Sequence, residues 1–119
     1  MGAAVSKLVY SRRLSSRVMI PDGVWAYWRC GGAEDISRVS DLSVGGLFLS
    51  TLIPQTVGVK AQLDFLVQEG DIRVEAEVRH LVPSGGLGLK FIAVSDPDCP
   101  NLIALLKRIR SGSQPRWAN

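Results

Sequence analysis

A short polar stretch between two apolar runs holds the side chains best suited to bind a charged ligand. These are Asp41, Ser43, Gly45 and Gly46. The two carboxylate oxygens of Asp41 match the adjacent N–H donors on the edge of a guanine base. In an extended chain Ser43 projects to the same face as Asp41, and its hydroxyl can bond a phosphate or a base edge. The two glycines permit a positive φ and a close approach of the backbone to a ligand. The pattern predicts a strand end with one face kept for a guanine-containing anion.

Three arginines upstream, Arg12, Arg13 and Arg17, supply the positive charge that such a ligand requires. A guanidinium can donate two hydrogen bonds to a phosphate or a guanine edge, and its plane can stack on a purine. Each pattern also has a structural explanation. Asp, Ser and Gly gather in tight turns, and basic segments are often solvated tails. The combination, order and separation of the two patterns favour a binding site.

In this order the two motifs resemble the PilZ domain, a bacterial family of cyclic di-GMP receptors. The family carries R-x-x-x-R and then [DN]-x-S-x-x-G, matched here by Arg13 and Arg17, and by Asp41, Ser43 and Gly46. The segment Gly86–Phe91 also resembles its closing strand. The resemblance implies that the arginines fold over cyclic di-GMP on the outside of a barrel. It also implies that occupancy is passed to an effector protein, which the sequence does not identify.

The residue before the R-x-x-x-R motif influences, in this family, whether one ligand molecule or a stacked pair is held. That residue is Arg12, a third cation in the segment. Two ligand molecules bring four phosphate charges together, and a third guanidinium lowers their repulsion. We therefore expect two molecules of cyclic di-GMP per chain.

The composition predicts one globular domain. A chain of 119 residues with 46% hydrophobic residues can form one core but not two. The net charge of +3 favours an anionic ligand but is too small to predict binding to DNA. No apolar run approaches the roughly 20 residues that span a bilayer, and residues 1–9 lack the apolar segment of a signal peptide. Cys30 and Cys99 show no metal-ligand spacing. We expect a cytoplasmic protein with free thiols and no membrane insertion.

Alternation of apolar and polar residues predicts an all-β fold, a small six-stranded antiparallel β-barrel, followed by a C-terminal α-helix. The six expected strands are Val24–Arg29, Ile36–Ser43, Leu47–Ser50, Val59–Val67, Ile72–Arg79 and Leu87–Ile92. Gly31-Gly32 is expected to form a hairpin turn. His80 extends the inward face of the fifth strand, which predicts a core or rim position.

Four segments are expected along the chain. Residues 1–22 form a flexible N-terminal arm with the arginine motif, 23–94 the barrel, 95–110 the helix and 111–119 a disordered tail. Ser95 is expected to cap the helix, and Leu102, Leu105, Leu106 and Ile109 form an apolar stripe for packing on the barrel.

No arrangement of side chains in the sequence supports catalysis. His80 is the only histidine, and Ser43 lacks a base partner. There is no phosphate-binding glycine loop and no metal cluster, so we expect no metal and no cofactor besides the ligand. Two other functions remain open. One is a barrel that binds single-stranded nucleic acid by stacking bases on Trp25 and Tyr27. The other is an adaptor that works without a ligand.

Overall fold

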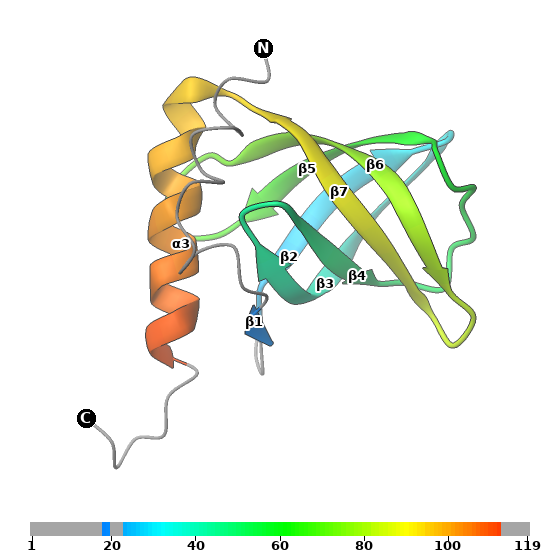
Figure 1. The fold of residues 1–119 in the computed structure, drawn as a ribbon, viewed down its shortest axis with the longest axis horizontal. Helices are drawn as coiled ribbons and strands as arrows, with labels where there is room; N and C mark the ends of the chain where they lie inside the picture. The colour runs from blue at the N-terminus through cyan, green and yellow to red at the C-terminus, as the bar shows by residue number, and fades with distance from the viewer. Residues whose placement is uncertain (1–17, 20–22, 113–119) are drawn as a thin grey trace.

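The computed structural model describes residues 18–19 and 23–112. Its strands are β1 (Val18–Met19), β2 (Trp25–Cys30), β3 (Ala33–Ser43), β4 (Gly46–Ser50), β5 (Lys60–Leu66), β6 (Arg73–Val82) and β7 (Gly86–Val94). They form one antiparallel sheet in the order β1-β3-β2-β5-β6-β7-β4. An additional pairing between β3 and β4 closes the sheet into a barrel (Figure 1). The predicted six-stranded barrel is confirmed as β2–β7. The short strand β1 is an addition that the sequence did not predict.

Alternation along each strand decides which side chains form the core. In β2 the inward residues Ala26 and Trp28 are fully buried, while Trp25 on the outer face is 44% exposed. The buried Trp28 indole donates a hydrogen bond to the Ser37 hydroxyl at 2.8 Å, so its polar atom is satisfied inside the core. The predicted inward residues of the fifth strand, Ile72, Val74, Ala76 and Val78, are all buried.

The turn between β2 and β3 depends on two glycines. Gly31 and Gly32 have φ values of 57° and 82°, which side chains with a Cβ rarely adopt. Because Cys30 pairs with Ala33, the loop contains these two residues alone, as the sequence predicted.

The C-terminal helix begins with a short 3₁₀ segment, η1 (Asp96–Asp98), and continues as α3 (Cys99–Gly112). In Figure 1, α3 lies across one end of the barrel. All four residues of the predicted apolar stripe are buried. Ser95 occupies the N-cap position, as expected, but its side chain makes no capping hydrogen bond.

Polar contacts from three positions of this helical segment fix it to the barrel. The Asp98 carboxylate accepts a hydrogen bond from the backbone N–H of Arg73 at 2.9 Å, and the Asn101 amide donates to the Asp71 carbonyl at 2.9 Å. Arg108 donates two hydrogen bonds to the Glu69 carboxylate, one of them at 3.1 Å. This interaction holds the pKa of Glu69 below its usual value.

The predicted terminal segments fall mostly outside the described residues. Residues 1–17, 20–22 and 113–119 are not described. Within the predicted arm, Val18 and Met19 form β1. Ser111 and Gly112, expected in the tail, belong to α3.

Candidate functional site

The predicted motif lies at the tight connection between β3 and β4. Ser43 pairs with Gly46, so Val44 and Gly45 form the turn. The Ser43 hydroxyl accepts a hydrogen bond from the Gly45 N–H at 3.2 Å and donates to the Gly46 carbonyl at 3.4 Å. Ser43 is 5% exposed. Its hydroxyl therefore holds the turn in shape, while direct contact with a ligand stays a prediction.

Through this motif Leu42, Ser43 and Val44 are all buried. Asp41 is half-buried. That Ser43 shares the outward face of Asp41 stays a prediction.

The two glycines act differently from what the sequence predicted. Neither Gly45 nor Gly46 has a positive φ. A Cβ atom at Gly46 would lie 2.2 Å from the Leu89 carbonyl oxygen, so glycine is needed here for the close approach to strand β7. A Cβ atom at Gly45 would lie 4.0 Å from its nearest neighbour, the Ser43 Oγ. Gly46 is required by packing, whereas Gly45 leaves an open backbone position at the turn.

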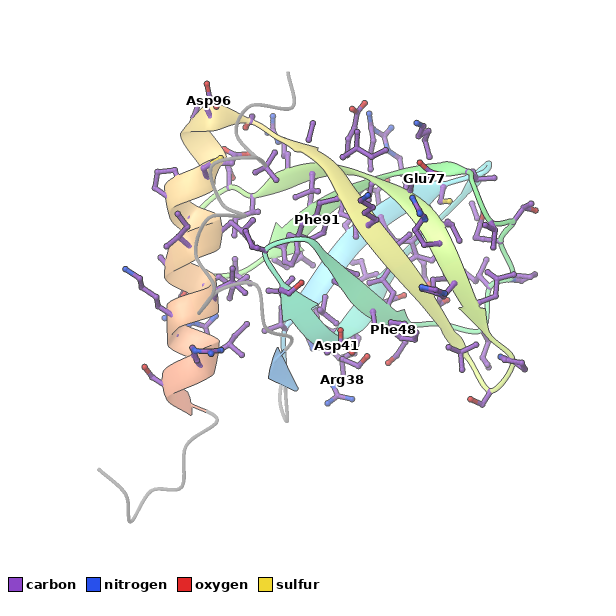
Figure 2. All side chains as sticks on the ribbon, viewed as in Figure 1. Arg38, Asp41, Phe48, Glu77, Phe91 and Asp96 are labelled. Carbon is purple, nitrogen blue, oxygen red and sulfur yellow. The ribbon has the colours of Figure 1, made fainter. Side chains whose placement is uncertain are left out.

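Asp41 lies where β3 has a neighbouring strand on each edge. It pairs with Phe48 of β4 on one edge and with Met19 of β1 on the other. The register between β3 and β4 shifts between Val39 and Asp41, a bulge that redirects the outward side chains at this point. Figure 2 shows Asp41 and Phe48 together on these two strands.

The predicted arginines Arg12, Arg13 and Arg17 lie outside the described residues. Their point of attachment is described, however. Val18, which follows Arg17 directly, pairs with Leu42, and Met19 pairs with Asp41. The chain therefore leaves the barrel toward the arginine motif beside the Asp41–Gly46 segment.

A row of residues that the sequence analysis did not identify continues from Asp41 across the barrel. Asp41 pairs with Phe48, Phe48 with Gly88, and Gly88 with His80. His80 is exposed, so the predicted core position is wrong. The register shift between Val78 and His80 explains this, because a bulge moves the side chains beyond it to the other face.

Glycines make this region flat, and we name it the glycine face: Phe48, His80, Gly86 and Gly88. A Cβ atom on Gly88 would lie 2.8 Å from Phe48 Cε1 and 3.2 Å from His80 Cδ2. A Cβ atom on Gly86 would lie 3.3 Å from Phe48 Cε2. The Phe48 ring therefore lies against the backbone of β7 at Gly86 and Gly88, and a larger residue at Gly88 would make the ring shift.

A pocket of about 220 Å³ adjoins the glycine face. It is lined by Gly45, Arg79, His80, Gly88, Leu89 and Lys90. Arg79 and Lys90 give it positive charge next to the turn. The Gly-x-Gly spacing of residues 86–88 was the one sign of this region in the sequence. Its neighbours Phe48 and His80 come from other strands, so the sequence did not reveal them.

A second outward surface, the aromatic face, consists of Trp25, Tyr27, Ile36 and Leu66. Trp25 pairs with Leu66, and Tyr27 pairs with Ile36. Trp25, Ile36 and Leu66 are each 44–52% exposed. The Tyr27 hydroxyl donates a hydrogen bond to Glu34 at 2.8 Å, which raises the pKa of Tyr27. This surface is apolar and filled by side chains.

A pocket of about 720 Å³ lies beside the start of the helix and combines charges of both signs. Its lining includes Arg29, Arg73, Asp64, Glu75 and Asp96. Among the residues that the structure describes, no group of three or more His, Cys, Asp or Glu could hold a metal ion. No helix in this part of the chain is long and apolar enough to cross a membrane.

Comparisons with known proteins agree with the fold. The family model of the PilZ domain matches residues 11–108, which include both motifs. The structure of the Bacillus subtilis inhibitor of motility (MotI/DgrA) is similar, with a TM-score of 0.68 and 16% identity over 84% of this chain and 53% of that chain. The Borreliella burgdorferi PlzA protein in complex with c-di-GMP has a TM-score of 0.55 and 20% identity over 82% of this chain and 42% of that chain. This chain thus spans about half the length of these two proteins. The search of curated proteins finds no match.

Proposed function

Because this chain belongs to the PilZ domain family, we propose that it binds cyclic di-GMP where its arginine motif meets the Asp41–Gly46 segment, and that the bound state contacts a partner protein. PilZ domains are non-enzymatic binding and adaptor domains, so the chain is a binding protein and not an enzyme. The PlzA structure, similar in fold, was determined with c-di-GMP.

The observation that carries the proposal is the pairing of β1 with the end of β3. Val18 pairs with Leu42 and Met19 with Asp41. Arg17 directly precedes Val18, and successive Cα atoms lie about 3.8 Å apart. The two motifs, separated by more than twenty residues in sequence, are thus attached to the barrel at one point. This supports a shared site better than the motif spacing alone.

The chemistry of these residues suits a guanine dinucleotide. Asp41 can accept hydrogen bonds from guanine N1–H and the 2-amino group, and adenine lacks that pair of donors. Arg13 and Arg17 can each donate two hydrogen bonds to a phosphate or a guanine edge. The pocket beside Gly45 adds Arg79 and Lys90, which favour a ligand with two negative charges.

We further propose two ligand molecules per chain, with Arg12 as the residue that permits the second. Two molecules bring four phosphate charges into one site, and Arg12 adds a cation and a stacking plane to Arg13 and Arg17. Titration of wild-type protein should end at two ligands per chain, and Arg12→Ala should move the end point toward one. A wild-type end point of one ligand would contradict this stoichiometry.

The cytoplasm is the compartment that we propose, since Cys30 and Cys99 are free thiols and this state suits a reducing environment. Burial raises the pKa of the Cys30 thiol, which makes it unreactive. The partner protein would contact a surface that ligand binding changes, which includes the arginine segment. The helix and the exposed residues of β2 are candidate contact surfaces, whereas Trp28 of that strand is buried and cannot contact a partner.

Isothermal titration calorimetry with cyclic di-GMP tests the function directly. We expect saturable binding that excess GTP does not displace, because GTP presents one guanine instead of two. The same titration with single-stranded oligonucleotides tests the exposed Trp25 as a stacking residue. The protein would instead be a nucleic-acid-binding protein if it bound oligonucleotides tightly and did not bind cyclic di-GMP. In that case the oligonucleotide affinity should fall steeply with salt and should be the same in Asp41→Ala.

A further inference from the structure

We propose that Phe48, together with the His80 imidazole beside it, forms a stacking surface for a guanine base of the ligand. The inference rests on the proposed function and adds two residues that belong to neither motif. Stacking on an aromatic ring stabilises a bound base without reading its identity. Asp41 would select the base, and Phe48 would hold its plane.

The register of four strands carries this inference. Asp41, Phe48, Gly88 and His80 form one row across β3, β4, β7 and β6. Neighbouring strands lie about 4.8 Å apart, so the Phe48 backbone is one strand spacing from that of Asp41. A planar base that bonds to the Asp41 carboxylate at its edge can therefore extend over the Phe48 ring.

The ring is also presented as a stacking surface. The neighbours of Phe48 in the strand, Leu47 and Leu49, are fully buried in the core, whereas Phe48 faces outward and is half-buried. Its ring edge lies over Gly86 and Gly88, where a Cβ atom would come within 3.3 Å and 2.8 Å of it. The two glycines let the ring settle against the strand. The ring therefore lies along the barrel surface instead of projecting into solvent, and one of its flat faces can stack on a base.

Charge beside this surface fits the rest of the ligand. The adjoining pocket of about 220 Å³ contains His80 together with Arg79 and Lys90. Lys90 pairs across the strands with Glu77, whose carboxylate also lies 4.0 Å from the Lys60 ammonium and offsets part of the positive charge there. Arg79 is exposed and adds positive charge to the pocket. The base surface and the positive pocket thus lie next to each other, as the base and phosphate of a nucleotide require.

The test combines calorimetry with proton NMR of the bound ligand. An aromatic ring under a base moves the guanine H8 resonance upfield. Phe48→Leu keeps an apolar side chain over the glycines but removes the ring, so we expect Kd to rise about 5- to 50-fold and the upfield shift to disappear. Phe48→Tyr should restore both. Tyr27→Leu removes another half-buried outward aromatic residue from the aromatic face and should change neither.

His80→Ala gives a second variant at an exposed position, where folding is expected to be unaffected. We expect it to weaken binding about two- to tenfold. Wild-type affinity and an unchanged H8 shift in Phe48→Leu would overturn the stacking surface. If Arg17→Ala abolishes binding while Phe48→Leu and His80→Ala do not affect it, the proposed function stands and this inference falls. Absence of cyclic di-GMP binding by wild-type protein overturns both.

Discussion

The glycine face and the aromatic face lie on the outside of the same barrel and follow the same strand alternation, yet they differ in how they fill their outward positions. On the aromatic face each outward position carries a large side chain, such as Trp25 opposite Leu66. On the glycine face, Gly86 and Gly88 have no side chains, and the Phe48 ring lies against their backbone. An exposed apolar surface favours burial against another protein. A flat surface beside Asp41, Arg79 and Lys90 favours a planar, charged ligand. The two faces therefore suit different partners.

The packing beneath the turn gives the largest expected effect. Gly46→Ala would force a Cβ atom to within 2.2 Å of the Leu89 carbonyl oxygen, and backbone cannot rotate away as a side chain can. We expect a loss of about 3 kcal/mol in the free energy of unfolding, measured by urea denaturation, and weakened ligand binding. Gly45→Ala is the matched control, because its Cβ atom would have 4.0 Å of space. Equal stability of the two variants would show that β4 and β7 do not pack in this register.

Arg17, in the predicted ligand motif, and Arg29, on β2, should respond differently to replacement by alanine. Arg17→Ala would remove the charged hydrogen bond to the ligand that we propose. Such a bond is worth about 1.5–3 kcal/mol, so Kd should rise roughly 10- to 150-fold. Arg29 is an exposed arginine of β2 that donates a hydrogen bond to Gln62. Arg29→Ala should leave the affinity unchanged. A comparable loss in both variants would mean that general positive charge, and not the site beside Asp41, holds the ligand.

The barrel and the helix were predictable from sequence because local patterns determine them. Alternation identified β2, β5 and β6, and two adjacent glycines identified the turn at residues 31–32. The apolar stripe that includes Leu102 and Leu106 identified the helix. Strand β1 was not predictable, because two residues carry no periodicity and are held by pairing with β3.

Features that depend on distant strands could not be predicted. The bulge before His80 moves that side chain from the inward face to the outside, and a bulge leaves no clear mark in the alternation. Phe48 meets Gly88 only because β4 pairs with β7, some forty residues later in the chain. Gly46 was assigned to a ligand by its residue type, yet its neighbour is the Leu89 carbonyl. Pairing between the strands, which local sequence does not reveal, therefore determines much of the candidate site.

Replacing Asp41, and separately Asp64 as a control, tests whether the site beside the glycine face recognises the base. Asp41→Ala should weaken cyclic di-GMP binding about tenfold and reduce discrimination against cyclic di-AMP, because adenine lacks the donor pair that the carboxylate accepts. Asp64 is a comparably half-buried carboxylate on β5, 3.6 Å from Arg73. Asp64→Ala should not alter the preference between the two dinucleotides. If wild-type protein binds both equally well, Asp41 does not recognise the base.

Removing the Arg108–Glu69 contact, which belongs to neither face, should have the smallest effect. It shows how far a loss of stability alone changes ligand affinity. The hydrogen bonds from Arg108 lower the pKa of Glu69, so the contact stabilises the fold when Glu69 is ionised. Since the folded-state pKa is depressed, this contribution is complete above the ordinary glutamate pKa of 4.5 and is lost as the pH falls through the lowered value. Arg108→Ala should cost about 0.5–1 kcal/mol of unfolding free energy at pH 7, a modest value because the Arg108 side chain is 43% exposed. The difference from wild type, measured by urea denaturation, should shrink steadily below pH 4.5. Ligand affinity at pH 7 should stay unchanged. If Arg108→Ala weakened binding as strongly as Asp41→Ala, affinity would follow global stability, and the contrast between the two faces would lose its basis.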